Sequence, residues 1–166
     1  MKVLAIDPGY GRCGVAVVER DNSGKDILVY SGCIETPSTE EFGERLNTVA
    51  QECRRLLEAH SPECVAMEKL YFSNNQKTAM RVAEVRGAIL AIAGAAYAPV
   101  FEYTPGEIKS AVAGSGSADK KQVAAMVRML VTISKPVRLD DEYDAIAIGL
   151  THLASAKMHA VHNASL

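Results

Sequence analysis

Four acidic residues are the candidates for chemistry in this sequence, because each one ends or begins an element that can fix its position. Asp7 ends a short apolar run and is followed by Pro8 and Gly9, which stop a strand and turn the backbone. Glu68 ends a second apolar run, over residues 64–67, in the same manner. If the two runs are parallel neighbours in one sheet, both carboxylates lie at its carboxyl edge.

Asp141 and Asp144 form a second acidic pair at the start of an apolar helical pattern. Their spacing places both on one face of the first helical turn, where negative charge is tolerated, although Asp140 also shares a face with Asp144 and competes with Asp141. Singly, each acid has an ordinary alternative as a turn or capping residue. Converging at one edge, all four would repel each other unless hard divalent cations with oxygen ligands, Mg²⁺ or Mn²⁺, lay between them.

The apolar patterns predict the elements that position these acids. Strands are expected over residues 3–6, 15–18, 27–34, 64–67 and 100–103. The first helix is expected to begin at the capping-box pair Ser38 and Glu41 and to end at about residue 60. Four more are expected: one over residues 77–97, a short one that ends at 113, one that begins at 118, and one over 140–158. This order predicts an α/β fold with a five-stranded mixed sheet flanked by helices. We expect residues 1–158 to form one domain and residues 159–166 a short tail.

Composition and charge restrict the class of protein. The chain has 166 residues, of which 48% are hydrophobic and 23% charged, which excludes disorder, collagen and coiled coil. The net charge is −2, yet residues 19–63 carry five basic and ten acidic side chains, whereas residues 69–138 carry ten basic and four acidic. The second stretch is the candidate surface for phosphate. The chain shows no signal-peptide pattern and its longest apolar run has eleven residues, which predicts a cytoplasmic protein without a membrane span.

The cysteines and histidines suggest no further chemistry. The cysteines at positions 13, 33, 53 and 64 form no C-x-x-C pair, and we expect small core residues rather than disulfides or zinc ligands. His152 lies eight residues after Asp144, but no second ligand has a matching spacing. We therefore expect it to be a hydrogen-bonded helix residue.

Several motifs together resemble the RuvC family of bacterial Holliday-junction resolvases. They are IDPG at residues 6–9, MEK at 67–69, GSGSADK at 114–120 and DEYDAIAI at 141–148. Their order and spacing match the family, and the resemblance extends from residue 2 to about residue 155. It implies a ribonuclease H-like fold, a homodimer, Mg²⁺-dependent paired nicking of four-way DNA junctions, and cooperation with the RuvAB branch-migration motor.

The resemblance also assigns roles to individual residues. It implies that Asp7, Glu68, Asp141 and Asp144 are the catalytic acids and metal ligands. In this interpretation two Mg²⁺ ions, for which Mn²⁺ can substitute, would clamp the scissile phosphate. Lys120 matches a family basic residue and is expected to offset charge on that phosphate, with a solvated helix lysine as an equal alternative.

Further basic and aromatic residues are candidates for contacts with DNA. Besides Lys120, four basic side chains are expected to contact backbone phosphates: Arg81, Arg86, Lys109 and Lys121. Tyr71 and Phe72 follow Glu68 and precede a polar loop. Because neighbouring residues face differently, we expect one ring to be buried and the other to contact an unpaired base beside the cut, and the resemblance favours Tyr71.

A ridge of small residues marks the helix expected over residues 77–97. Its members recur every four residues: Ala79, Ala83, Gly87, Ala91 and Ala95. Such a ridge permits close approach of another backbone, either from the protein's own sheet or from a second copy. Because two symmetric cuts require two sets of acids and the chain carries one, we expect a homodimer built on this helix.

Three other functions stay open at this point. The first is a YqgF-like, ribonuclease H-like monomer that acts on RNA. The second is a non-catalytic junction-binding module, which the complete set of acids disfavours. The third is an actin-like phosphotransferase, whose phosphate loop also follows a strand with Asp and Gly, but 166 residues leave no room for the second domain that closes over ATP.

Overall fold

The computed structural model describes residues 1–70, 76–133, 137 and 139–163, which form five strands and five helices. In chain order they are β1 (Lys2–Asp7), β2 (Arg12–Arg20), β3 (Asp26–Glu35), α1 (Phe42–His60), β4 (Cys64–Glu68), α2 (Gln76–Ala95), β5 (Val100–Tyr103), α3 (Pro105–Ala113), α4 (Lys120–Leu130) and α5 (Asp140–Asn163). Each expected strand is present, and the expected succession of strands and helices is confirmed.

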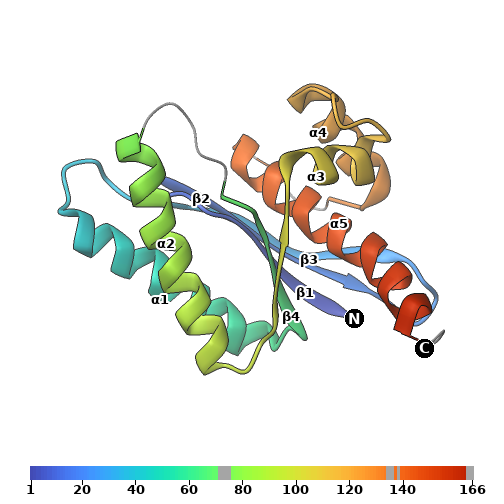
Figure 1. Ribbon diagram of the computed structural model, residues 1–166, viewed down its shortest axis with the longest axis horizontal. Coiled ribbons are helices and arrows are strands. Elements are labelled where there is room, and N and C mark those ends of the chain that lie inside the picture. Colours follow the sequence, from blue (N-terminus) through green and yellow to red (C-terminus); the bar gives the residue numbers. More distant parts are fainter. Residues whose placement is uncertain (71–75, 134–136, 138, 164–166) are drawn as a thin grey trace.

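The strands form one mixed sheet in the order β3-β2-β1-β4-β5 (Figure 1). β1 pairs antiparallel with β2, and β2 with β3, whereas β1 pairs parallel with β4, and β4 with β5. A parallel pair needs a crossover, and α2 supplies it between β4 and β5. The expected five-stranded mixed sheet is confirmed. Its parallel β1–β4 pair brings the ends of these two strands to one edge.

Alternate side chains of each strand face opposite sides of the sheet and enter two separate cores. In β1, Leu4 and Ile6 pack with residues of α1 and α2, whereas Val3 and Ala5 pack with residues of α3, α4 and α5. Figure 1 shows the same division, with α1 and α2 on one face of the sheet and the other three helices on the opposite face. The fold is therefore a sheet enclosed between two helical layers.

Several helix ends differ from the sequence expectations. The Ser38–Glu41 capping box is wrong, because α1 begins at Phe42 with Glu41 as its N-cap residue, and no side chain caps it. Ser38 lies in the preceding turn, three residues too early to reach the first helical N–H groups. α4 begins at Lys120 rather than 118, because Asp119 and Gln122 form a capping box.

The ends of α2 and α5 also differ. α2 stops at Ala95 rather than at residue 97, and Tyr97 adopts a left-handed backbone with φ of 54°. α5 continues through Asn163, so the expected end of this helix at about residue 158 is wrong. Among the described residues, none of the helices combines the length and the apolar character needed to cross a membrane.

The cysteines and His152 occupy the places expected of them. Cys13, Cys53 and Cys64 are buried, Cys33 is half-buried, and all four thiols are free. The buried His152 ring has its Nδ1 2.8 Å from the Tyr103 hydroxyl and its Nε2 3.2 Å from Cys64 Sγ. The expectation of a hydrogen-bonded helix histidine is confirmed.

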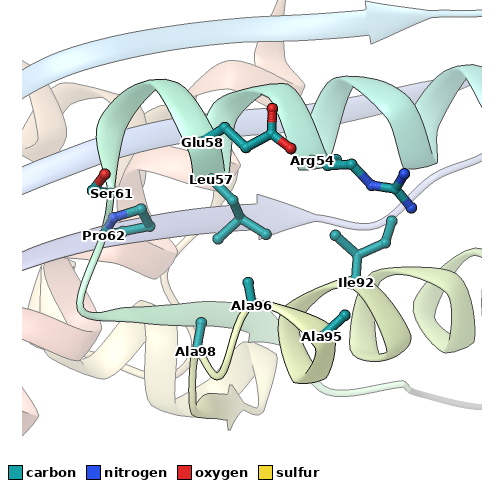
Figure 2. Close-up of a pocket in the computed structure, with 9 residues that line it drawn as sticks. All are labelled: Arg54, Leu57, Glu58, Ser61, Pro62, Ile92, Ala95, Ala96 and Ala98. Atoms are coloured by element: carbon teal, nitrogen blue, oxygen red, sulfur yellow. The ribbon is translucent and has the colours of Figure 1, made fainter.

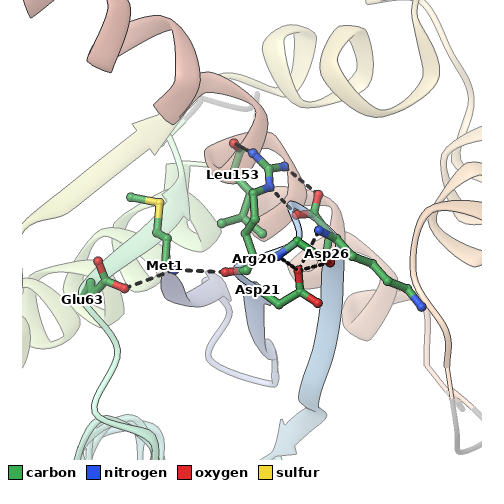
Figure 3. A network of polar contacts seen from close by, with 8 residues as sticks. Met1, Arg20, Asp21, Asp26, Glu63 and Leu153 are labelled. Atoms are coloured by element: carbon green, nitrogen blue, oxygen red, sulfur yellow. Dashed lines mark hydrogen bonds and ion pairs between the residues drawn. The ribbon is translucent and has the colours of Figure 1, made fainter.

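Two polar contacts attach α5 to the β2–β3 hairpin. Arg20 donates two hydrogen bonds to the Asp26 carboxylate, at 2.6 and 2.7 Å, and a third of 2.6 Å to the Leu153 carbonyl oxygen of α5 (Figure 3). Near the start of α5, the buried Glu142 carboxylate accepts a 3.0 Å hydrogen bond from the Ser31 hydroxyl of β3. These contacts fix the orientation of the helix whose first residues carry acids.

The start of α5 also packs directly on Gly14 of β2. A Cβ atom at this position would lie 2.0 Å from the Asp141 carbonyl oxygen. We expect Gly14→Ala to destabilise the protein by about 1–3 kcal/mol, because the methyl group displaces the first turn of α5.

Gly43→Ala is the matched control, since nothing lies within 4 Å of a Cβ there. It should be neutral or slightly stabilising, because alanine favours helix more than glycine. Urea denaturation compares the two variants. Equal free energies of unfolding for the two variants would mean that α5 can move away from residue 14 without loss of stability.

Candidate active site

Asp7 and Glu68 end neighbouring parallel strands at the carboxyl edge of the sheet. The register pairs Ile6 of β1 with Met67 of β4. Asp7 and Glu68 are the next residues of these strands, so they lie side by side. Both side chains are partly buried. A cleft of about 170 Å³ opens beside them, with Thr78 of α2 on its wall. Asp7 and Glu68 therefore lie at the carboxyl edge of the sheet, as the sequence predicted.

Asp141 and Asp144 complete an acidic group with the two strand-end residues. The charges of Asp144, Glu68 and Asp141 all act on Asp7, after burial as the largest cause, and together they raise its pKa to about 7. Burial and the nearby charge of Asp144 likewise raise the pKa of Glu68. The four acids named from the sequence are therefore close enough to interact.

Asp140 and Asp141, which the sequence left in competition, occupy different environments. The Asp141 side chain is 17% exposed, and its charge acts on Asp7. The Asp140 side chain is 56% exposed. Asp141 Oδ2 is also buried without a hydrogen-bond partner among the described residues. The position of Asp141 therefore fits the acidic group better.

Two cations lie against these acids. Lys120, the first residue of α4, has its Nζ 2.9 Å from Asp144 Oδ2, and this hydrogen bond is the largest cause that raises the pKa of Lys120 to about 12. Arg12, the first residue of β2, has its Nε 3.1 Å from Asp141 Oδ2. Arg12 was missed from the sequence, where its only signal is a basic residue in the turn after the first strand. The β1–β2 pairing and the packing of α5 bring it to the acids.

The ligand chemistry of this group fits divalent cations. All four acids offer the carboxylate oxygens that Mg²⁺ and Mn²⁺ prefer, and the buried Asp141 Oδ2 lacks a hydrogen bond. In the part of the chain that the structure describes, however, no three His, Cys, Asp or Glu side chains are gathered into a group that could hold a metal ion. The donor set is suitable, and its carboxylates must approach one another to bind a cation.

The raised pKa of Asp7 predicts a pH-dependent stability in the absence of divalent cations. Its pKa rises from 3.8 to about 7, so the native state binds this proton more tightly than the unfolded state. The stability that Asp7 contributes therefore falls as the pH rises from about 4 to about 7. We expect Asp7→Asn to raise the free energy of unfolding in EDTA by up to about 4 kcal/mol above neutral pH, and by little at about pH 4.

Urea denaturation at about pH 4 and about pH 8 measures this difference, within the pH range of the shift. Glu58→Gln, at an exposed position on α1, is the control and should show the same small change at both pH values. An equal gain in the free energy of unfolding for Asp7→Asn at both pH values would mean that the gain does not come from the charge of Asp7.

The expected phosphate contacts lie on both faces of the sheet. Lys109 on α3 is close enough to Glu68 to lower the pKa of that acid, against the larger effect of burial. Lys121 is exposed at the start of α4. On the other face, Arg81 of α2 is exposed, and its guanidinium carbon lies 3.8 Å from the centre of the Phe42 ring. These three cations remain accessible to a phosphate.

Arg86 has a different role from the one expected. Its side chain is 9% exposed, and its guanidinium donates hydrogen bonds to the Glu68 carbonyl oxygen and the Glu102 carboxylate. The expectation of a phosphate contact is wrong, because both bonds tie α2 to the ends of β4 and β5. Arg86 thus supports the backbone of one of the acids.

The fold and the acidic edge define the class of protein. A five-stranded mixed sheet between two helical layers, with acids at the carboxyl edge, is a ribonuclease H-like fold. Residues 3–152 match the family model described as crossover junction endodeoxyribonuclease RuvC. The chain belongs to this family.

Individual relatives agree over nearly the whole chain. The crossover junction endodeoxyribonuclease RuvC of Moorella thermoacetica is 43% identical over 156 residues, which cover 94% of this chain and 93% of that protein. The structure of Thermus thermophilus RuvC in complex with a Holliday junction substrate matches with a TM-score of 0.89 and 34% identity, over 96% of each chain. The yeast mitochondrial Holliday junction resolvase Ydc2 shares the fold, with a TM-score of 0.72 at 16% identity, over 97% of this chain and 83% of that chain.

Proposed function

We propose that this protein is an endonuclease that resolves Holliday junctions by paired symmetric cuts during DNA recombination and repair. The observation that carries the proposal is the convergence of four acids from β1, β4 and α5 in a chain of the crossover junction endodeoxyribonuclease family. The related Thermus thermophilus RuvC was solved in complex with a Holliday junction substrate, which makes the same substrate the first choice for this chain. A substrate of chromosomal DNA also places the protein in the cytoplasm.

The proposed reaction is Mg²⁺-dependent hydrolysis of a DNA phosphodiester bond, with Mn²⁺ able to substitute. Asp7, Glu68, Asp141 and Asp144 would hold two cations per site. When bound, divalent cations supply an activated water molecule and stabilise the leaving 3′ oxygen. Lys120 lies beside the acids, where its ammonium group offsets the charge of the scissile phosphate.

Contacts outside the acids position the DNA. We propose that Lys109 and Lys121 contact its backbone on one side of the acidic edge and Arg81 on the other. Tyr71 and Phe72 lie outside the described residues and remain our candidates for a ring that stacks on an unpaired base beside the cut.

Arg81 and Lys121 give a test of this binding surface. We expect the double replacement of both by Ala to weaken junction binding and to flatten its salt dependence, by up to about 0.9 in the logarithmic slope for each lost phosphate contact on B-DNA. Titrations at several salt concentrations in EDTA measure the slope.

The double replacement of Lys25 and Arg55 by Ala is the matched control, because it removes the same charge from exposed positions on the β2–β3 turn and α1. Its slope should equal that of the wild type. An unchanged slope for the Arg81 and Lys121 variant would mean that these side chains do not contact phosphate.

An exposed face of α2 supports a homodimer. Four members of the small-residue ridge are exposed: Ala83, Gly87, Ala91 and Ala95. The fifth, Ala79, is buried in the protein's own core. A hollow of about 500 Å³ lies between the C-terminal ends of α1 and α2, lined in part by the apolar Leu57 and Ile92 and by the charged Arg54 and Glu58 (Figure 2). Ala95 belongs to both features, so a second copy packed on α2 would cover one continuous surface of small, apolar and charged side chains.

The family resemblance extends the proposal to a further partner. We propose that the dimer cooperates with the RuvAB branch-migration complex, which would bring the four-way junction to the position where it is cut. Two sets of acids related by a two-fold axis match the symmetry of the junction.

Incubation with labelled nucleic acids tests the proposed activity. The substrates are a four-way junction, a linear duplex and an RNA–DNA hybrid, each with Mg²⁺ or with EDTA. We expect symmetric nicks in the junction alone, and only with Mg²⁺. Cleavage of the hybrid would favour a YqgF-like activity on RNA, and binding without cleavage would favour a non-catalytic junction-binding module.

A further inference from the structure

Asp140 joins the two cations of the acidic edge into one network. Its Oδ1 lies 3.8 Å from Arg12 Nη2, and its Oδ2 lies 3.4 Å from Lys120 Nζ. Arg12 also contacts Asp141, with 3.1 Å between Nε and Oδ2, and Lys120 contacts Asp144, with 2.9 Å between Nζ and Oδ2. Two side-chain cations therefore pair with three carboxylates at the start of α5 and leave one negative charge without a cation of its own.

This network explains why the acids, although close, do not form a ligand group. Asp141 and Asp144 are paired with Arg12 and Lys120, and no three potential ligands are gathered among the described residues. The contact at Asp141 bears more directly on a ligand position, although it is 0.2 Å longer than the one at Asp144, because Asp141 Oδ2 is buried and Arg12 is the cation beside it. A divalent cation that binds through this oxygen must move the guanidinium away.

We propose that Arg12 is a displaceable counter-ion, a positioning residue that neutralises Asp141 until a divalent cation binds and then transfers its guanidinium to a DNA phosphate. This proposal rests on the proposed function. A guanidinium group binds carboxylate and phosphate with the same planar set of donors, so the exchange replaces one anionic partner with another.

The environment of Arg12 suits such an exchange. Its side chain is 49% exposed, and ion pairs with this much solvent contact contribute little to stability. The contrast with Arg86 is direct, since that guanidinium is buried and held by two hydrogen bonds at the same edge. Arg86 is fixed in the fold, whereas the half-exposed Arg12 guanidinium can leave its carboxylate, and the divalent cation that replaces it compensates the charge of the buried Asp141 Oδ2.

The exchange has two consequences. Without DNA, Arg12 competes with divalent cations for Asp141 and lowers their affinity. With DNA, the released guanidinium gains a phosphate contact, so cation binding and DNA binding strengthen each other. The coupling is a property of Arg12 and is lost when its charge is removed.

Metal affinity in the absence of DNA tests the first consequence. Isothermal titration of the whole protein with Mn²⁺ compares the wild type with Arg12→Gln and Arg12→Lys. We expect Arg12→Gln to bind Mn²⁺ about three- to tenfold more tightly, because a nearby positive charge is gone, and Arg12→Lys to resemble the wild type. Lys25→Gln, which removes the same charge from an exposed position on the β2–β3 turn, should have no effect.

An unchanged or weaker Mn²⁺ affinity in Arg12→Gln would overturn the proposal. Unchanged affinity would mean that Arg12 does not compete at all, and weaker affinity would mean that it merely holds Asp141 in place. Far-ultraviolet circular dichroism and thermal unfolding establish that each variant is folded. If Arg12→Gln fails to fold, Arg12→Ala removes the same charge and should bind Mn²⁺ more tightly by a similar factor. Arg12→Lys, which keeps the charge, should not.

The second consequence is tested with junction DNA. Binding of the four-way junction is measured in EDTA and in Ca²⁺, which replaces Mg²⁺ to slow cleavage. We expect the gain in affinity from Ca²⁺ to be severalfold smaller in Arg12→Gln than in the wild type, and an equal gain would overturn the exchange. If the wild type cleaves no junction, the proposed function fails, whereas the Mn²⁺ affinities still decide the competition at Asp141.

Discussion

Asp7→Asn, Glu68→Gln, Asp141→Asn and Asp144→Asn are each expected to reduce junction cleavage by about 10³-fold or more, while junction affinity in EDTA stays the same or rises slightly. The reason is that each change removes a proposed oxygen ligand, whose cation would supply several kcal/mol of transition-state stabilisation, and each 1.36 kcal/mol is a factor of about ten in rate. Affinity is retained because carboxylates repel phosphate and contribute nothing to binding it.

Single-turnover cleavage and gel-shift titrations of the same preparations measure both quantities. Glu63→Gln, between α1 and β4, is the matched control, since it removes one exposed acid that is not among the four. An active Asp141→Asn together with an inactive Asp140→Asn would overturn the assignment on α5. Loss of junction binding in all four variants would point to unfolding rather than to lost ligands.

Ala83→Arg and Gly87→Arg are expected to give folded monomers that do not make paired nicks. Both positions are exposed in the single chain, and nothing outside the backbone of its own helix lies within 4 Å of a Cβ at Gly87. The same arginine placed between two copies of α2 would bury an unpaired charge, which costs about 3–5 kcal/mol and weakens the dimer by at least about 100-fold.

Sedimentation velocity gives the oligomeric state, and circular dichroism shows whether the variants are folded. Ala154→Arg, at an exposed position on α5, is the matched control and should remain a dimer with wild-type activity. A wild-type protein that is monomeric at micromolar concentration and still resolves junctions would contradict the dimer proposal and favour the YqgF-like alternative.

The sheet and its acids were predictable from the sequence because both depend on local patterns. Short apolar runs predicted the strands, and the residues that end them, Asp7 and Glu68, came to one edge because β1 and β4 are parallel. Helical spacing alone did not decide between Asp140 and Asp141, since both share a helical face with Asp144, and only the family resemblance named Asp141. The choice depends on how α5 rotates against Gly14 of β2.

The partners of charged side chains were harder to predict from the sequence than the strands and the acids that end them. Arg86 has the sequence character of a surface cation, yet it is buried because the Glu68 carbonyl oxygen and the Glu102 carboxylate meet it from two strands. Arg12 gave almost no signal, because its contact with Asp141 joins residues far apart in the chain. Such pairs arise from tertiary packing and leave no periodicity to detect.

Coordinated cutting of one junction tests the central claim most directly. A supercoiled plasmid that extrudes a cruciform carries one four-way junction, and two symmetric cuts within the lifetime of one complex convert it directly to a linear molecule. We predict that the wild-type protein yields linear plasmid with ligatable ends in Mg²⁺ and no product in EDTA. Accumulation of nicked circles alone, or equal cutting of a plasmid without the cruciform, would contradict the claim that this protein is a junction resolvase.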